Sequence, residues 1–214
     1  MNDPTPYPPE YFAREDDSDD RHFYRMPRKV VHIDQPAVDM LRERVFRPLL
    51  PAGGRILDLM SSWRSHLPPD VALGRVVGLG LNGEEMADNP QLDDYVEHDL
   101  NTTPDLPFAD GAFDAALCTV SIQYLTRPVE VFSEVRRVLI PGAPFIVSFS
   151  NRCFPSKAVW VWLFTDDAKH QALVIDYLER AGFDGIHTED HAPRSGDPLY
   201  AVIGHAPKDV LRGK

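Results

Sequence analysis

The sequence predicts an α/β fold with a doubly wound, seven-stranded, mostly parallel sheet, helices on both faces and an antiparallel last strand. Short apolar runs alternate with segments of helical periodicity along the chain of 214 residues, which is typical of strand–helix units in a parallel sheet. The run over 112–118 is nearly all apolar, as expected for a strand covered on both faces. The last two apolar runs lie close together, so we expect them to pair antiparallel.

Each element follows from local signals. Strands are expected over 55–59, 74–80, 95–98, 112–118 and 145–149, and near 185–188 and 199–204. Helices are expected over 34–50, 83–87, 129–139 and 167–181. Asp34 suits the N-cap of the first helix and Gly182 the end of the last, because a side-chain oxygen caps free amides and glycine tolerates a left-handed turn.

Charge and composition limit the choice of partner and compartment. The net charge is −11, and residues 1–20 hold seven acidic residues against one basic residue. No cluster of Lys and Arg is present to neutralise phosphates, so no nucleic-acid partner is expected. No apolar run approaches transmembrane length, so no membrane partner is expected. Two cysteines without a pairing pattern favour a reducing compartment, and we expect a cytoplasmic protein.

Three segments carry a family resemblance. They are Ile56-Leu-Asp-Leu59, Leu106-Pro-Phe-Ala-Asp-Gly-Ala-Phe-Asp114, and the helix 131–139 followed by Pro141-Gly142. In this order and spacing the chain resembles a class I S-adenosylmethionine (SAM)-dependent methyltransferase with a type 11-like domain, over about residues 30–205. The resemblance implies a Rossmann-like fold, SAM as cofactor and a small-molecule methyl acceptor. Four further segments, 58–68, 77–82, 98–101 and 148–151, are similar to a poorly characterised branch of methyltransferase-like proteins in bacteria and plants.

The resemblance, together with the acidic and Pro-rich composition of the N-terminus, defines the expected domain organisation. Residues 1–20 are expected to form an acidic, Pro-rich flexible tail, 21–54 a capping segment and helix, and 55–207 the methyltransferase-like domain. The oligomeric state is not readable from the sequence.

The chain departs from the family at the cofactor loop. Met60, Ser62 and Arg64 stand where the family has three glycines, which let the backbone approach the ligand closely. Gly80 ends the second strand where the family usually has an acid that binds the ribose hydroxyls. Asn82, two residues on, is the expected substitute, although its neutral hydrogen bonds are weaker than charge-assisted ones.

The resemblance and the positions of the strand ends assign the candidate site. Asp58 is expected to organise the first loop and the cofactor's amino group, and Asp99 to lie near the adenine amino group; the alternative for both is a turn or helix cap. Ligands bind at the carboxyl ends of parallel strands, which adds residues after strand four. The cofactor-binding candidates are Asp58, Leu59, Met60, Ser61, Ser62, Gly80, Leu81, Asn82, Asp99, Leu100, Thr119 and Val120. The substrate-binding candidates are Tyr24, Trp63, Ser121, Gln123 and Tyr124.

Two histidines are catalytic candidates. His32 precedes the first helix, and His66 lies just after the cofactor loop; the alternative for each is a structural role. His98 is expected to be structural, and His170 to lie on a solvated helix surface. No Cys or His cluster has zinc spacing, so no metal is expected.

Three functions are compatible with these patterns. The first is methyl transfer from SAM to a small molecule, which is favoured by the polar residues Asp58, Asn82 and Asp99 after the first three strands. The second is a catalytically inactive binding or regulatory protein on the methyltransferase fold, motivated by the glycine-free loop and Gly80. The third is another nucleotide or nucleoside ligand, which no phosphate-binding glycine loop supports.

Overall fold

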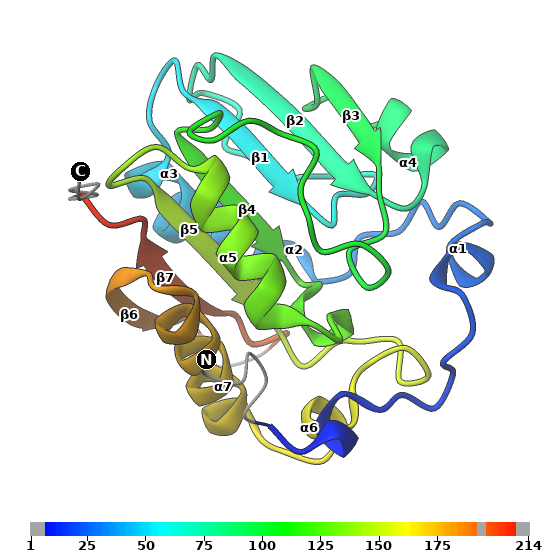
Figure 1. Ribbon diagram of the computed structural model, residues 1–214. Coiled ribbons are helices and arrows are strands. Elements are labelled where there is room, and N and C mark those ends of the chain that lie inside the picture. The colour runs from blue at the N-terminus through cyan, green and yellow to red at the C-terminus, as the bar shows by residue number, and fades with distance from the viewer. Residues whose placement is uncertain (1–6, 192–195, 209–214) are drawn as a thin grey trace.

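The computed structural model describes residues 7–191 and 196–208, in which seven strands form one sheet. The strands are β1 (Arg55–Leu59), β2 (Arg75–Gly80), β3 (Asp94–Glu97), β4 (Ala115–Thr119), β5 (Pro144–Phe149), β6 (Asp184–Asp190) and β7 (Tyr200–His205). Their order is β3-β2-β1-β4-β5-β7-β6, and β7 pairs antiparallel with both of its neighbours (Figure 1). The predicted sheet and its antiparallel strand are therefore confirmed.

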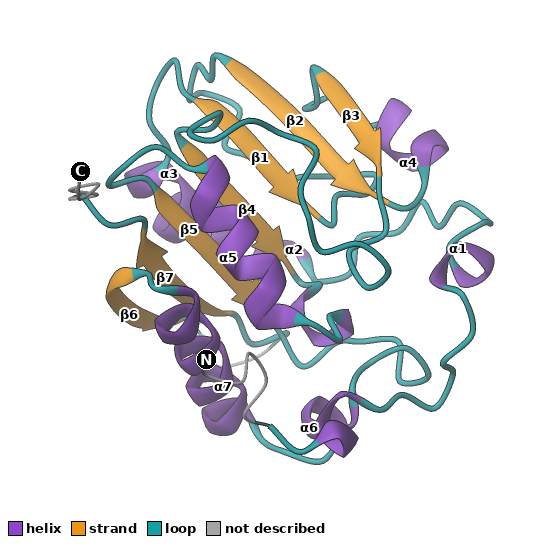
Figure 2. Ribbon diagram, in the orientation of Figure 1, coloured by secondary structure: helices purple, strands orange, loops and turns teal. Residues whose placement is uncertain are grey.

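Helices cover both faces of the sheet, as Figure 2 shows. One face carries α5 (Pro128–Val138) and α7 (Asp167–Ala181), and the other carries the helical segment 35–49. The remaining short helices are η1 (Pro9–Phe12), α1 (Asp20–Phe23), α4 (Gly83–Ala87), η3 (Ile122–Tyr124) and α6 (Trp160–Leu163). Alternate residues of the central strands enter opposite core clusters: Leu57 and Cys118 face α5, whereas Ile56 and Leu117 face the segment 35–49.

The predicted helix 34–50 is not a regular α-helix throughout. It consists of α2 (Gln35–Met40), a π-helical turn η2 (Leu41–Phe46) and α3 (Arg47–Leu49). The amide of Arg47 donates to the carbonyl of Arg42, five residues back. Pro48 has no amide hydrogen, and its ring would clash with a carbonyl in regular α geometry, so the wider turn accommodates the proline.

The predicted flexible tail is wrong for residues 7–20, whereas residues 1–6 lie outside the described residues. Residues 7–33, here called the N-terminal strap, run along the edge toward which the parallel strands point (Figure 1). Tyr7 packs edge-on against Tyr177 with ring centroids 5.6 Å apart. Trp160 donates its amide to the carbonyl of Ala13 at 2.8 Å. The strap is therefore packed onto the domain rather than unattached.

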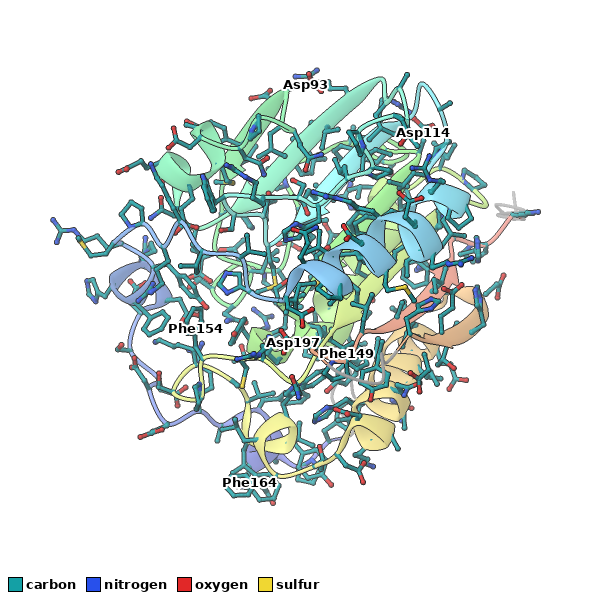
Figure 3. All side chains as sticks on the ribbon, turned by 180° about the vertical axis from the view of Figure 1, so that it is seen from behind. Asp93, Asp114, Phe149, Phe154, Phe164 and Asp197 are labelled. Carbon is teal, nitrogen blue, oxygen red and sulfur yellow. The ribbon has the colours of Figure 1, made fainter. Side chains whose placement is uncertain are left out.

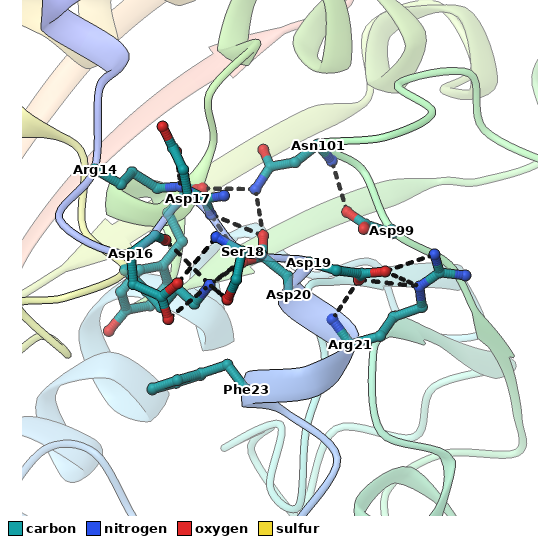
Figure 4. Close-up of polar contacts among 12 residues, drawn as sticks. Arg14, Asp16, Asp17, Ser18, Asp19, Asp20, Arg21, Phe23, Asp99 and Asn101 are labelled. Carbon is teal, nitrogen blue, oxygen red and sulfur yellow. Dashed lines mark hydrogen bonds and ion pairs between the residues drawn. The ribbon is translucent and has the colours of Figure 1, made fainter.

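A buried ion-pair network holds the strap. Lys157 is fully buried, and its Nζ lies 3.1 Å from both the Asp16 and Asp20 carboxylates. Arg14 donates to both oxygens of Asp20 at 2.8–2.9 Å, and Asn101 donates to one of them at 2.9 Å (Figure 4). Burying these charges is tolerated because each finds an opposite charge and hydrogen bonds. Asp16 and Asp20, two of the acids that suggested a solvated tail, instead help to anchor it.

His170 also differs from its expected position. Its ring is buried, and it stacks on Trp162 with ring centroids 4.0 Å apart and an interplanar angle of 1°. Its Nε2 lies 2.9 Å from the Trp162 carbonyl oxygen. His170 is therefore part of the packing between α6 and α7 rather than of a solvated surface.

Candidate functional site

A cavity of about 340 Å³ lies at the carboxyl ends of β1, β2 and β4. The strap supplies one wall through Asp20, Tyr24, Arg28 and Val30–His32. Phe154 lines the cavity beside the strap (Figure 3). The other lining residues are Asp58, Met60, Ser61, Ser62, Arg64, His66, Leu79, Gly80, Leu81, Asn82, Glu85, His98, Asp99, Leu100, Asn101, Thr119, Val120, Ser121, Tyr124, Leu125, Arg152 and Cys153.

Sixteen of the nineteen predicted site residues line this cavity, and Leu59, Trp63 and Gln123 do not. Leu59 is buried in the core beneath the strand end. The Trp63 ring contacts the guanidinium of Arg64, 3.7 Å from the ring centroid. Gln123 is buried, and its side-chain nitrogen donates to the carbonyl of Val120 at 3.0 Å. These three side chains are committed to packing or local bonding, so the assigned binding roles do not fit them.

The loop after β1 is held by Asp58. One oxygen of this buried carboxylate accepts the hydroxyls of Ser61 and Ser65, each at 2.6 Å. Asn89 donates to the Ser65 hydroxyl at 2.9 Å and to the Ser62 carbonyl at 3.0 Å. Serine hydroxyls thus fix the loop through side-chain bonds.

The missing strand-two acid has a structural cause in the loop after β1. The amide of Ser61 donates to the Leu79 carbonyl at 2.8 Å, which brings the loop down onto the end of β2. A Cβ on Gly80 would overlap the backbone carbonyl oxygen of Ser61. Any side chain at this position, an acid included, would displace the loop. Gly80 is therefore required by the loop that covers it.

The proposed substitute Asn82 is occupied by other contacts. Its side-chain oxygen accepts the amide of Glu85 at 2.9 Å and caps α4, while its nitrogen donates to the Tyr24 carbonyl at 2.7 Å. Asn82 therefore joins α4 to the strap, and in this arrangement it does not present a free amide to a ribose.

Asp99 likewise caps a turn, which was the structural alternative expected for this residue. Its carboxylate accepts the amide of Asn101 at 3.0 Å and the hydroxyl of Thr102 at 2.8 Å, which forms an Asx turn. Asn82 and Asp99 both line the cavity, but their side chains form hydrogen bonds with other residues of the protein. A role for Asp99 near adenine stays a prediction.

Backbone strain is concentrated at the cavity. Among the described residues, three that are not glycine have positive φ: Met60 at 55°, His66 at 57° and Val120 at 51°. All three line the cavity. Such conformations cost about 1–3 kcal/mol each and are found at functional sites, where the surrounding structure enforces them. The backbone strain at these three residues is therefore consistent with a functional binding site.

The two candidate catalytic histidines share the cavity and are neutral at pH 7. Burial and the nearby Arg42 guanidinium lower the pKa of His66 to about 4. Burial also lowers the pKa of His32, against an opposing effect of Glu85. Neutral imidazoles can accept a proton, but a low pKa makes them weak bases.

Replacing Asp58 by asparagine is expected to remove a pH-dependent part of the stability. Burial raises the pKa of Asp58 to about 6, above about 3.9 for an unfolded chain. The folded state therefore binds the extra proton, so this group favours folding below pH 4, and that contribution is lost as the pH rises through 6. The difference between wild-type and Asp58→Asn unfolding free energies should change by about 2–3 kcal/mol over this range.

Urea unfolding from pH 4 to pH 8 measures this difference. Asp114→Asn is the control, because hydrogen bonds with Arg55 lower the pKa of Asp114 below its ordinary value. Its contribution is lost only as the pH falls below about 4, so from pH 4 to pH 8 the curve of this variant should run parallel to that of wild type. Parallel curves for wild type and Asp58→Asn would contradict the raised pKa.

Sequence reasoning missed several lining residues, among them the buried carboxylates of Asp20 and Glu85. Asp20 is bound in the ion-pair network of the strap, whereas Glu85 belongs to α4. The position of Glu85 three residues after Asn82 is the spacing of a capping pattern at a helix start. That local pattern explains Glu85 without a ligand. Phe154 and Arg28 were missed because they come from loops whose course depends on distant contacts.

The comparisons with known proteins agree with this geometry. The family described as "Methyltransferase domain" matches residues 65–147. A ubiquinone/menaquinone biosynthesis C-methyltransferase, UbiE of Roseobacter denitrificans, is 28% identical over 112 residues, which is 51% of this chain and 45% of that protein. The chain thus spans less than half the length of the curated relatives it matches.

Solved structures share the fold. A structure titled as an S-adenosylmethionine-dependent methyltransferase of Mesorhizobium loti aligns with a TM-score of 0.53 and 20% identity, covering 75% of this chain and 95% of that one. A structure titled as the [4+2]-cyclase SpnF aligns with a TM-score of 0.57 and 18% identity, covering 80% and 81%. Likeness at this identity shows the fold. In the part of the chain that the structure describes, no helix is long and apolar enough to cross a membrane.

Proposed function

We propose that this chain, which carries a methyltransferase domain of the type 11 kind on the class I, SAM-dependent fold, transfers the methyl group of SAM to a small-molecule acceptor. The observation that supports the proposal best is the cavity itself. It lies at the carboxyl ends of the central parallel strands, where ligands bind in this type of sheet. Its residues come from the loops after β1, β2, β3 and β4, the four strand ends at which the cofactor-binding candidates were expected.

The residues present fit the cofactor in two respects. The volume of about 340 Å³ lies within the range of small-molecule sites. The hydroxyl oxygen of Thr119, at the end of β4, is buried and has no hydrogen-bond partner within the described structure. A buried polar atom without a partner is costly, so a hydroxyl that lines a cavity is expected to bond to what fills it.

Bound SAM would supply a methyl group on a positively charged sulfur, which would pass to the acceptor's lone pair while the electron pair of the broken carbon–sulfur bond stays on sulfur, leaving S-adenosylhomocysteine. The loops after β1, β2, β3 and β4 would hold the cofactor. What the protein contributes is position: it holds the nucleophile in line at about 3–3.5 Å. The proton released by the acceptor passes to His32, to His66 or to water.

The weak basicity of the two histidines limits which chemical groups could serve as the methyl acceptor. Because the pKa of each is lowered by burial, neither can remove a proton from a weakly acidic alcohol efficiently. A thiol, a carboxylate or an acidic carbon or phenol needs less assistance. The proposal therefore favours an acceptor that is already ionised, or nearly so, at neutral pH.

A small acceptor fits the composition of the strap wall. Tyr24, Val31 and Phe154 give this side of the cavity aromatic and apolar surface. The exposed Val30 and Val31 extend the apolar surface to the edge of the cavity. No basic cluster in the sequence provides for a polyanion. The UbiE-like relative, named as acting in quinone biosynthesis, points in the same direction.

Calorimetry with S-adenosylhomocysteine tests the proposal. We expect micromolar binding and a higher melting temperature with bound ligand, because a ligand that binds only the folded state stabilises it. SAM should compete with S-adenosylhomocysteine for the same site. Absence of both heat and thermal shift at millimolar ligand would overturn the proposal.

The second candidate is an inactive binding protein on the same fold. It is favoured by the internal bonds of Asn82 and Asp99, which leave fewer side chains for the cofactor. The likeness to a cyclase shows that the fold also occurs in a protein named for another reaction. Binding of S-adenosylhomocysteine without transfer from SAM to any of the ionised acceptors would favour this candidate.

A further inference from the structure

We infer that Glu85 takes the place of the missing strand-two acid and accepts hydrogen bonds from the ribose hydroxyls of the cofactor. The inference rests on the proposed function. It starts from the finding that Gly80 has no room for a side chain, because the Ser61 carbonyl occupies that space. Asn82 does not serve either, because its side chain caps α4 and holds the strap.

Glu85 is the acid that remains beside the end of β2. It follows that strand by five residues and lies in α4, whose contacts are with β2 and β3. Its side chain lines the cavity together with Gly80, Leu81 and Asn82. It is only 6% exposed. A carboxylate has therefore been placed against the same part of the cavity from the following helix instead of from the strand.

The bonding of Glu85 is incomplete. One oxygen accepts the backbone amide of Arg28, and the other accepts the hydroxyl of Ser62 at 2.6 Å. Lys29 of the strap pairs with Glu84 and Asp88 rather than with Glu85. A carboxylate offers about four lone-pair sites, so about two stay available. A buried carboxylate with spare acceptor sites facing a cavity suits a neutral ligand group with two donors.

The two hydroxyls of a ribose are such a group. They are donors without charge, and charge-assisted bonds to a carboxylate are about twice as strong as neutral ones. The contacts that Glu85 already makes fix its direction: Ser62 belongs to the loop after β1 and Arg28 to the strap. Glu85 therefore connects both walls of the cavity at the expected ribose position.

Calorimetry with Glu85→Gln tests the assignment. The variant should bind S-adenosylhomocysteine about 10- to 100-fold more weakly than wild type, because one charged acceptor becomes a neutral group that can no longer accept at both ends. Glu84→Gln is the matched control: Glu84 is the neighbouring acid of the same helix but is exposed and pairs with Lys29 at 3.7 Å. It should bind like wild type.

A ligand that lacks the 2′-hydroxyl separates a direct contact from a general change in the cavity. Wild type should bind S-adenosylhomocysteine much more tightly than its 2′-deoxy analogue, and Glu85→Gln should bind the two within a few-fold. Equal weakening of both ligands, or unchanged binding of both, would overturn the assignment. Failure of wild type to bind S-adenosylhomocysteine would instead overturn the proposed function, so the two failures are distinguishable.

Discussion

Replacing Lys157 by methionine is expected to lower the free energy of unfolding by about 3 kcal/mol. The side chain is fully buried, and its ammonium group bonds to the carbonyls of Asp16 and Ser18 at 3.1 and 2.8 Å in addition to its two carboxylate partners. Methionine fills a similar volume but leaves these oxygens without their donor. Chemical denaturation at pH 7 measures the loss.

Lys29→Met is the matched control for this change. Lys29 also pairs with an aspartate, Asp88, but its side chain is 41% exposed. Exposed pairs contribute about 0–1 kcal/mol, since water solvates both charges once the pair is broken. Equal losses for the two variants would show that the buried network does not anchor the strap.

Replacing Gly80 by alanine is expected to have an effect of similar size, about 3 kcal/mol, at the upper end of the usual cost of overpacking. The added methyl group meets backbone, the carbonyl of Ser61, which cannot turn away as a side chain can. The loop must move, and the Ser61 bonds to Leu79 and Asp58 move with it. Both the melting temperature and the binding of S-adenosylhomocysteine should fall.

The neighbouring glycine provides the control. A Cβ on Gly83 would also overlap an atom, but that atom is the carboxylate end of Glu97, which can swing toward solvent. Gly83 is the first residue of α4, where alanine is acceptable to a helix. We expect Gly83→Ala to be nearly neutral. If Gly80→Ala is equally neutral, the loop does not lie as the structure places it.

The parts of the fold that were predictable from sequence are those fixed by local patterns. The bounds of β1 and α7 agree with the expectation because periodicity and end signals coincide there, Asp166 and Gly182 capping α7. The strap was not predictable. Its position depends on Lys157, 141 residues from Asp16 in the sequence, and composition alone favours a solvated tail for such an acidic segment.

In the site, the positions of the residues were predictable from sequence, but their hydrogen bonds were not. Strand register was enough to place Asp58, Asn82 and Asp99 at one cavity. The hydrogen-bond partners of their side chains could not be predicted, because Asp and Asn can both bind ligands and cap local turns. Gly80 was readable only as an absent acid, since the reason for the glycine is the backbone of a loop nineteen residues earlier in the sequence.

The cavity has a floor formed by strand ends and a wall formed by the strap, and the two come from different stretches of the sequence. The floor belongs to strand ends within or next to the stretch shared with the methyltransferase family, residues 65–147. The wall formed by Tyr24, Arg28 and His32 lies upstream of that stretch. Changes in this wall can alter which molecule is admitted while the sheet beneath stays as it is. Under the proposed function, acceptor choice would be encoded separately from the scaffold, and relatives that share the floor need not share a substrate.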